Sequence, residues 1–337
     1  MGDRYSRQKL FSEFGEAGQA RLRRARVVVV GCGALGSVGS EMLVRAGVGR
    51  LRIVDRDYVE LSNLQRQSLF TEADVEERNP KAVAAERALR RINSDVEVTG
   101  LVEDLDFRNI DRLLEEADLI LDGADNFEVR FLVNDYCVKH GIPWVYGAAV
   151  GSYGLAMAVV PGKTACLRCL FPDPPAPGSG ETCDTAGILA PIIHVVTAFQ
   201  VTQTLRILTG QTPSEGLLTV DVWRDDWRRL SVQGPMDSCP CCGLGRFEFL
   251  SGSGSTSSTH LCGRNAVQIK PPEGGRIDLA ELARRLQGTV PVELGRYLLQ
   301  ILPAPFEISL FPDGRAIVKG TDDVAEARAL YARYVGS

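Results

Sequence analysis

Arg26-Val-Val-Val-Val-Gly-Cys-Gly-Ala-Leu-Gly-Ser37 is the stretch of the chain that decides the fold. The four consecutive valines predict a strand that is buried on both faces. The glycines that follow, Gly31-x-Gly33-x-x-Gly36, predict a tight turn into a helix that continues to Ala46. Such a turn lets the backbone approach a ligand, and the first N–H groups of the helix face its negative charge. The stretch therefore predicts a site for the phosphates of a nucleotide.

Asp55 ends the next apolar run, nineteen residues after Gly36. An acidic residue about 20 positions beyond the glycines binds the ribose in βαβ nucleotide folds. Strands and helices go on alternating, with strands expected over 97–101, 119–122 and 143–149 and helices over 81–92 and 128–140. This alternation predicts a doubly wound, Rossmann-like α/β fold with a mostly parallel sheet. Its polar loops should meet at the carboxyl edge of the strands.

The pattern changes after Gly151. Residues 188–208 read as one long helix, and antiparallel strands that extend the sheet are expected over 155–160, 164–168, 217–222 and 227–232. Residues 251–260 are rich in serine and glycine, which predicts a flexible linker. The chain therefore divides into a large domain over 1–250, the linker, and a small α+β domain over 261–337.

The composition is ordinary for a soluble globular protein, with 45% hydrophobic and 24% charged residues in 337. The net charge of -5 argues against a nucleic-acid surface, which is usually basic. No uncharged apolar run is long enough to cross a bilayer, and the first residues lack the apolar core of a signal peptide. We therefore expect a cytoplasmic protein with no nucleic-acid or membrane partner. Its nine cysteines should serve as metal ligands or reactive thiols.

Two cations bear on which nucleotide binds. The default ligand of this fold is a dinucleotide used for hydride transfer, so an NAD-dependent oxidoreductase is one hypothesis. Arg66 and Lys81 follow Asp55, in the polar loop and at the start of the next helix, at the edge where the ligand binds. Two cations there suit a triphosphate better than a nicotinamide, although a single Arg or Lys is more often a solvated surface charge.

Asp125 follows the buried run that ends at Asp122. A carboxylate in this position can hold Mg²⁺ against phosphate oxygens, because magnesium takes only one or two protein carboxylates. The alternative is that Asp125 caps the helix that follows, a role that Asn126 could serve equally well. From the sequence both interpretations stay open.

The cysteines fall into two C-x-x-C pairs and one that stands outside them. Two such pairs are the usual signature of a closed, structural zinc site, formed here by Cys166, Cys169, Cys239 and Cys242. Cys241 could replace Cys242 as a ligand, although the C-x-C spacing fits less well. Cys183 stands outside the pairs, on a long loop before the long helix. It could be a nucleophile with a lowered pKa or a small side chain that fills space, and the sequence leaves both interpretations open.

Together these stretches resemble a known family, the ThiF/MoeB-type adenylyltransferases that activate ubiquitin-like sulfur carriers in thiamine and molybdopterin biosynthesis. They share a fold with the adenylation domains of ubiquitin-activating enzymes. The matching stretches are Arg4–Gln8, Gly31–Gly36, Asp55–Asp57, Ser62–Gln67, Pro80–Lys81, Asp122–Asn126, Cys166–Cys169, Thr182–Gly187 and the pair Cys239 and Cys242.

The resemblance implies roles for individual residues. Asp55 would bind the ribose, and Asn63, Arg66 and Lys81 would contact the phosphates of ATP. Asp125 would hold Mg²⁺, Arg7 would reach the active site of the other subunit of a homodimer, and Cys183 would form a covalent link to the carrier. Ala34 stands where many members have a third glycine, which is tolerated if its φ is negative. The implied nucleotide-binding set is Gly31, Gly33, Ala34, Gly36, Asp55, Asp57, Ser62, Asn63, Arg66, Lys81, Asp125 and Asn126.

The implied reaction is the adenylation of a carrier protein at its Gly-Gly C-terminus. The carboxylate attacks the α-phosphorus of ATP, and catalysis consists of alignment and charge neutralisation by Arg7, Arg66, Lys81 and Mg²⁺. Later thiocarboxylate formation would need a sulfur donor, a cysteine desulfurase or a rhodanese. The C-terminal region resembles an accessory domain of a longer subgroup. A scaffold subunit without catalysis is a further alternative, and the pathway and the carrier stay open.

Overall fold

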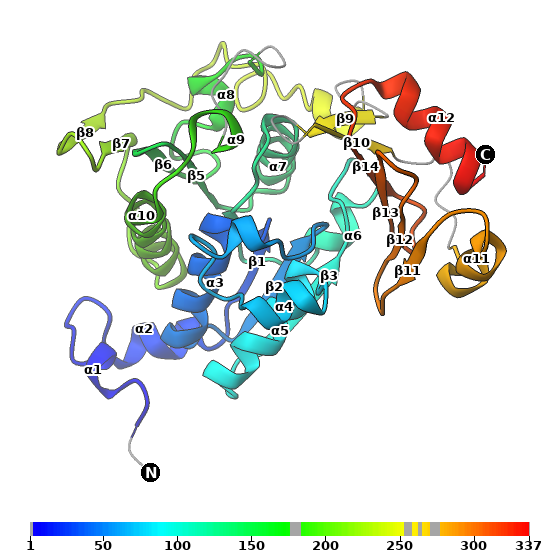
Figure 1. Cartoon of the computed structure of the whole chain (residues 1–337). Helices are drawn as coiled ribbons and strands as arrows, with labels where there is room; N and C mark the ends of the chain where they lie inside the picture. The colour runs from blue at the N-terminus through cyan, green and yellow to red at the C-terminus, as the bar shows by residue number, and fades with distance from the viewer. Residues whose placement is uncertain (1–2, 176–182, 253–257, 262–264, 270–276, 337) are drawn as a thin grey trace. The chain divides into compact units, whose positions relative to one another are not determined.

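The computed structural model describes residues 3–175, 183–252, 258–261, 265–269 and 277–336 (Figure 1). The chain divides into two units by its internal contacts. The first comprises Met1–Pro177 and Ile188–Ser255, and the second comprises Gly178–Gly187 and Thr256–Ser337. Each unit is described by itself below.

The first unit is built on an eight-stranded sheet in the order β3-β2-β1-β4-β5-β6-β7-β8. Strands β3 to β5 in this order are parallel, and β5 to β8 are antiparallel. The prediction of a doubly wound, mostly parallel sheet with an antiparallel extension is confirmed. The strand bounds are β1 Arg26–Val30, β2 Arg50–Asp55, β3 Glu97–Val102, β4 Leu119–Asp122, β5 Trp144–Val150, β6 Tyr153–Val159, β7 Leu217–Asp221 and β8 Asp226–Leu230.

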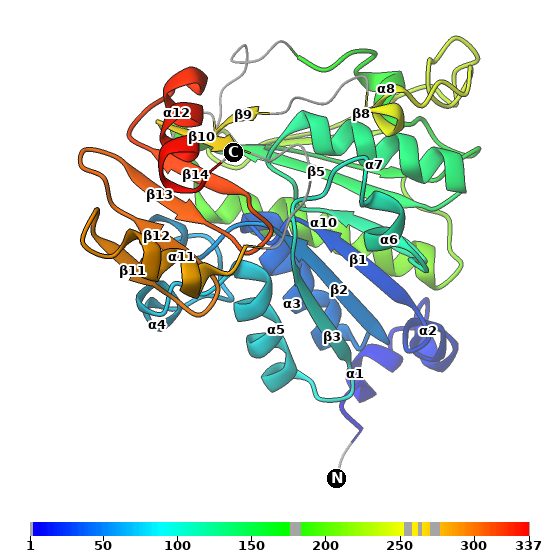
Figure 2. The same cartoon turned by 90° about the vertical axis from the view of Figure 1, so that its right-hand side faces the viewer.

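Alternation along β1 explains why both faces of this sheet need a cover. Val27 and Val29 belong to a core with α3, α5 and α10, whereas Val28 and Val30 belong to a core with α6 and α7. Figure 2 shows the sheet between these two helical layers. The helices of this unit are α1 Ser6–Lys9, α2 Gly15–Leu22, α3 Ala34–Ala46, α4 Glu72–Glu76, α5 Lys81–Ile92, α6 Ile110–Leu114, α7 Phe127–His140, α8 Leu167–Leu170 and α10 Ala190–Leu208.

The strand expected over residues 164–168 is wrong, because the chain turns there. Gly162 has a φ of +74°, and the Thr164 hydroxyl accepts from the backbone N–H of Val160 at 2.8 Å. These bonds close a turn directly after β6, and the short helix α8 follows with Cys166 as its N-cap. The antiparallel partner of β6 is β5 instead.

Helix α10 fixes the carboxyl end of β4 against β5. It begins at Ala190 with Pro191 in its first turn, where the missing N–H costs nothing. The buried Gln200 donates through Nε2 to the backbone carbonyls of Asp122 at 2.8 Å and Val145 at 3.2 Å. One side chain therefore ties the carboxyl end of β4 to the first residues of β5.

The second unit is an antiparallel sheet in the order β11-β12-β13-β14-β10-β9, with α11 and α12 on its apolar face. Strand β9 begins at Ser258, so the predicted linker over 251–260 ends in a strand that pairs with β10. The bounds are α9 Cys183–Ala186, β9 Ser258–Leu261, β10 Ala266–Ile269, α11 Leu279–Leu286, β11 Val292–Leu294, β12 Leu299–Ile301, β13 Glu307–Leu310, β14 Ala316–Lys319 and α12 Val324–Tyr334.

Among the described residues, no helix combines the length and the apolar character that crossing a bilayer requires.

Candidate active site

The turn between β1 and α3 is tightly packed at Gly31 and Gly36 but has room for a Cβ at Gly33. Gly31 has a φ of +86°, and a Cβ there would lie 2.4 Å from the carbonyl oxygen of Gly123. A Cβ at Gly36 would lie 1.8 Å from the carbonyl oxygen of Gly31, so the helix packs too closely onto the turn for any side chain. At Gly33 the nearest atom is 3.9 Å away. Gly33 is also the N-cap of α3 and brings no side chain to its first N–H groups, which leaves them to a ligand.

Asp55 lies beside this turn at the end of β2. Its carboxylate accepts from the backbone N–H of Cys32 at 2.5 Å and from that of Asp57 at 2.6 Å. Burial raises the pKa of Asp55, while the charge of Lys81 and the two N–H donors favour the ionised form. The carboxylate is thus fixed at the lip of the glycine turn, where the sequence places a ribose.

Lys81 is the first residue of α5, and only 4% of it is exposed. Its Nζ lies 3.2 Å from Asp57 Oδ2, and its backbone N–H donates to the Asp57 carbonyl at 2.8 Å. A buried ammonium needs a partner of opposite charge, and Asp57 supplies it next to Asp55. The structure therefore holds a cation beside the glycine turn, as the sequence predicts.

Arg56 is a site residue that the sequence reasoning missed. Its Nη1 lies 2.9 Å from Asp104 Oδ1, and its Nε lies 3.8 Å from Asp57 Oδ1. The charges of Asp104, Asp57 and Asp125 all act to raise the pKa of Arg56. A charged residue directly after the predicted ribose carboxylate was the available signal. Arg56 connects the end of β2 electrostatically with the loop that carries Asp125.

The short helix η1 (Leu61–Asn63) opens the loop that faces the turn. Asn63 is buried, and its Oδ1 accepts from the backbone N–H of Glu60 at 3.1 Å. Ser62 is exposed, and Arg66 donates through Nη1 to the Ser62 carbonyl at 2.7 Å. The Asn63 Oδ1 therefore stabilises the loop itself. Arg66 is bonded through Nη1 to the backbone of the same loop.

The structure decides which residue caps α7. The Asn126 Oδ1 accepts from the backbone N–H of Val129 at 2.9 Å, so Asn126 is the N-cap. Asn126 also donates to the Asp125 carboxylate at 3.0 Å. Asp125 is exposed and is not used as the cap. Its carboxylate remains available for a cation at the same edge of the sheet.

A buried ion pair supports this loop from below. Arg130 donates through Nε to Asp122 at 3.1 Å, and through Nη2 to the carbonyls of Ala124 at 2.7 Å and Gly147 at 2.9 Å. Burial raises the pKa of Asp122, against the influence of Arg130 and of two N–H donors. The pair joins the end of β4 and the middle of β5 to α7, which fixes the starting point of the Asp125 loop.

Arg7 is not brought to this site by the described residues of its own chain. Arg7 is exposed on α1, whose neighbour Gln8 donates to the carbonyl of Ala46 at 2.9 Å. Ala46 ends α3, and this 13-residue helix places it about 18 Å from the glycine turn. Cys183 begins the short helix α9, and its side chain lies outside the described residues.

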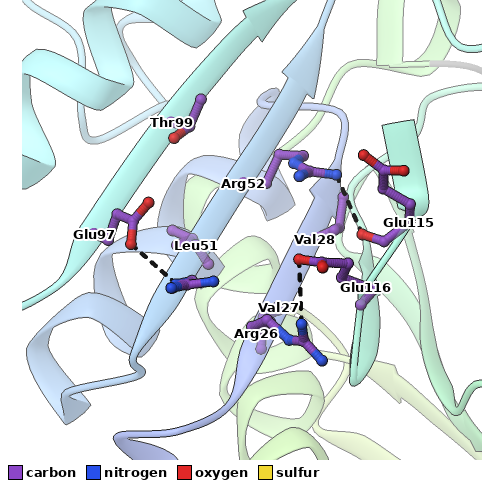
Figure 3. A pocket seen from close by; sticks show the side chains of 11 residues that line it. Arg26, Val27, Val28, Leu51, Arg52, Glu97, Thr99, Glu115 and Glu116 are labelled. Carbon is purple, nitrogen blue, oxygen red and sulfur yellow. Dashed lines mark hydrogen bonds and ion pairs between the residues drawn. The ribbon is translucent and has the colours of Figure 1, made fainter. Parts of the chain in front are cut away.

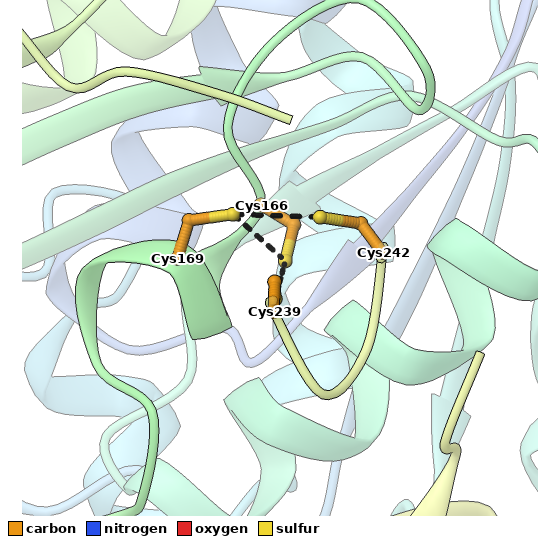
Figure 4. A group of neighbouring side chains, drawn as sticks. All are labelled: Cys166, Cys169, Cys239 and Cys242. Carbon is orange, nitrogen blue, oxygen red and sulfur yellow. Dashed lines mark hydrogen bonds between the residues drawn. The ribbon is translucent and has the colours of Figure 1, made fainter. Parts of the chain in front are cut away.

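Four cysteines from two distant segments form a cluster (Figure 4). The Cys166 and Cys239 sulfurs are 3.6 Å apart, and the Cys169 and Cys242 sulfurs are 3.4 Å apart. In a tetrahedral site with Zn–S bonds of 2.3 Å the sulfurs lie about 3.8 Å from one another. The spacing of the cluster fits a metal ion such as zinc with no open position.

Cys241 lies beside the cluster but is not one of the four candidate ligands. It is buried, and its sulfur accepts from the side-chain amide of Asn134 at 3.3 Å. A hydrogen bond from Cys241 is the largest of the influences that lower the pKa of Cys166 to about 4. The structure therefore favours Cys242 over Cys241 as the fourth ligand.

A pocket lies at the opposite end of the central strands (Figure 3). Within it Arg26 pairs with Glu116 at 3.2 Å, and Arg50 pairs with Glu97 at 3.0 Å. Arg52 donates to two backbone carbonyls. Each arginine is thus engaged by the protein, and nothing marks this pocket as an anion site. It is lined by Arg26, Val27, Val28, Arg50, Leu51, Arg52, Glu97, Thr99, Glu115, Glu116 and Ala117.

The fold and the site define a class: nucleotide-binding α/β proteins in which acidic and basic groups meet at the glycine turn of a doubly wound sheet. The profile of the ThiF family matches residues 5–241. The chain belongs to the ThiF family.

Relatives and solved structures agree with this assignment. The chain is 49% identical to the sulfur carrier protein ThiS adenylyltransferase of Bacillus subtilis (strain 168), over the full length of both proteins. The protein of that name from Escherichia coli (strain K12) is 36% identical over 242 residues, which cover 71% of this chain and 94% of that one. The crystal structure of E. coli MccB with ATP is 26% identical. It matches 72% of this chain and 75% of that one with a TM-score of 0.63.

Proposed function

We infer that the chain is an adenylyltransferase that uses ATP to activate the C-terminal carboxylate of a sulfur carrier protein. The observation that carries this inference is the buried Lys81–Asp57 pair beside Asp55 at the glycine turn. A buried cation at the phosphate position suits a triphosphate. The adenylyltransferase name of a relative that matches the whole chain at 49% identity supports the same activity.

The site has a place for each part of ATP. Asp55 would accept from a ribose hydroxyl, and the phosphates would pass over the first turn of α3. Lys81 and Arg66 would then neutralise phosphate charge. Asp125, which is exposed and does not cap α7, would hold Mg²⁺, and this ion would supply further charge neutralisation on the phosphates.

The reaction is a substitution at the α-phosphorus. A bond forms between a carboxylate oxygen of the carrier and the α-phosphorus, and the bond to the bridging oxygen of the β-phosphate breaks. The electron pair leaves with pyrophosphate, and the carrier keeps AMP as an acyl-adenylate. No proton has to move, so this chain needs to align the two reactants and to stabilise developing charge.

Three further proposals concern the second subunit, the metal and the carrier. Because Arg7 lies near the far end of α3 in its own chain, it would reach a nucleotide only in a second copy, so we propose a homodimer with Arg7 acting in trans. The cysteine cluster would hold a structural zinc ion. A Gly-Gly terminus of the carrier would fit beside Gly147–Ser152, a stretch of small side chains at the end of β5.

The test is ATP–pyrophosphate exchange with and without a carrier protein that ends in Gly-Gly. We expect exchange only with the carrier, and a loss of about 100-fold or more in an Asp125→Ala variant. Asp173→Ala changes another exposed aspartate and should leave the rate unchanged. Full exchange in the Asp125 variant would refute the proposed mechanism.

Two assays on the same protein distinguish the proposed activity from the competing functions. An NAD-dependent oxidoreductase would bind NADH tightly in a fluorescence titration, and a scaffold subunit would show no exchange with any carrier. The covalent role of Cys183 and the sulfur donor belong to the later transfer step. A thiol-sensitive conjugate of enzyme and carrier, absent in Cys183→Ala, would support that role.

A further inference from the structure

Gln67 is a buried polar residue of the site that the proposed mechanism does not use. It closes the loop after η1, where its backbone N–H donates to the Asn63 carbonyl at 3.0 Å. Only 3% of the residue is exposed, and its Oε1 has no hydrogen-bond partner among the described residues. A buried acceptor without a donor costs about 1–3 kcal/mol, so its presence calls for a ligand that satisfies it.

The Gln67 amide lies beside Gly33 of the glycine turn. Its Nε2 is 3.9 Å from the point where a Gly33 Cβ would stand, and among the described residues outside Gly33 and its chain neighbours no other atom lies within 4 Å of that point. The equivalent points at Gly31 and Gly36 are filled by backbone atoms. The room for a Cβ at Gly33 therefore lies between the first turn of α3 and the Gln67 carboxamide.

The position of Asp55 indicates which phosphate occupies this space. Asp55 is bonded to the backbone N–H of Cys32, the residue directly before Gly33. In ATP only the C5′ methylene and one oxygen separate the ribose ring from the α-phosphorus. If Asp55 holds the ribose, as the proposed function requires, then the α-phosphate lies over Gly33 and next to the Gln67 amide.

We propose that Gln67 is a catalytic residue, whose carboxamide donates through Nε2 to a non-bridging oxygen of the α-phosphate. This inference rests on the proposed function. When the carrier carboxylate attacks, negative charge grows on the non-bridging oxygens, and a fixed neutral donor stabilises it. Gln67 neither gains nor loses a proton. The hydroxyls of the same nucleotide can donate to Oε1, so one ligand satisfies both ends of the carboxamide.

The test uses two substitutions of similar size, Gln67→Met and Gln67→Glu. The first removes the donor, and the second also places a negative charge beside the phosphate. We expect Gln67→Met to lower kcat of carrier-dependent exchange by about 100- to 1,000-fold, as for other lost transition-state donors, with a smaller loss in ATP affinity. By calorimetry both variants should weaken AMP and ATP binding by similar factors, because the two nucleotides share the α-phosphate.

Gln65 provides the matched control on the same loop. It is exposed, and its amide makes only a 3.5 Å contact with the Ile188 carbonyl among its described contacts. Gln65→Met and Gln65→Glu should leave AMP affinity and kcat unchanged. Unchanged kcat in both Gln67 variants would overturn the proposal, and so would a loss of ATP affinity without a loss of AMP affinity.

Thermal melts and nucleotide affinities distinguish a structural role of Gln67 and a failure of the proposed function from the proposed catalytic role. A purely structural role of Gln67 would lower the melting temperature equally with and without nucleotide and would spare kcat, which would refute the proposal. If the native protein shows no exchange with any carrier, the proposed function fails. The AMP and ATP affinities of the Gln67 variants still decide whether this side chain contacts the α-phosphate.

Discussion

At the scale of the residue, alanine substitutions can distinguish the glycine that leaves room for the ligand, Gly33, from the glycine that allows close packing, Gly36. Gly33→Ala should fold, because φ is −76° and the nearest atom to the new methyl is 3.9 Å away. The methyl would occupy the proposed phosphate space, so we expect ATP affinity to fall by at least about 10-fold, which corresponds to 1.4 kcal/mol. Calorimetry with ATP and a thermal melt check the two halves of this prediction.

Gly36→Ala is the contrasting variant. Its methyl would lie 1.8 Å from the Gly31 carbonyl oxygen, so the helix start has to shift. We expect a loss of about 1–3 kcal/mol or more in the free energy of unfolding, as for other overpacked sites. An ATP affinity of Gly33→Ala equal to that of the native protein would contradict the assigned phosphate path.

Arg130 offers a prediction with a pH dependence. Arg130→Met leaves the Asp122 carboxylate buried without its partner, which should cost about 3–5 kcal/mol. The pKa of Asp122 is already raised by burial and rises further in the variant, so the folded state binds a proton that the unfolded state has released. The destabilisation should therefore be small in acid and grow as the pH rises through the raised pKa.

Urea unfolding of Arg130→Met at acid and at neutral pH measures this effect. The double variant Arg130→Met/Asp122→Asn removes the buried charge and should lose the added pH dependence. A destabilisation of Arg130→Met that does not change with pH would assign the effect to packing against Phe127 and Tyr146 instead.

At the scale of the element, the cysteine cluster joins α8 to the segment after β8. Cys242→Ser should abolish the binding of one metal ion per chain, whereas Cys241→Ser should keep it, because Cys241 is not among the four clustered sulfurs. Metal analysis of both purified variants checks this difference. Chelation of the native protein should release the constraint on a loop of this length, worth about 4 kcal/mol. Retention of metal by Cys242→Ser and its loss by Cys241→Ser would reverse the ligand assignment.

At the scale of the whole molecule, the two units should differ in what they contribute. The ThiS adenylyltransferase of E. coli matches this chain over 242 residues, which are 94% of the E. coli protein. The E. coli protein is therefore too short to contain a counterpart of most of the second unit. We expect a chain ending at Ser255 to fold and to bind ATP with the affinity of the full chain. Calorimetry on the truncated chain tests this, and loss of ATP binding would show that the second unit is needed.

The sequence predicted most of the fold because its signals are local. The valine run and the glycine turn are each readable within a few positions. The strand expected over residues 164–168 was wrong because the chain, after the local turn at Thr164, enters the short helix α8. Arg56 and Gln67 belong to sequence motifs of the family, but the contacts that make them site residues are with distant positions. Arg56 pairs with Asp104, and the Gln67 amide lies beside Gly33. From the sequence either Asp125 or Asn126 could cap α7, and only the hydrogen bond from the Val129 N–H shows that Asn126 does so.

The spacing of the cysteine pairs has a consequence for synthesis on the ribosome. Cys239 follows Cys166 by 73 positions, and α10, β7 and β8 lie between them. At about 5–20 residues per second the second pair is made about 4–15 s after the first. During that interval the nascent chain carries only half of the proposed metal site. Binding by four thiolates could begin only once the last strands of the nucleotide-binding unit have been translated, so metal capture would mark the completion of that unit.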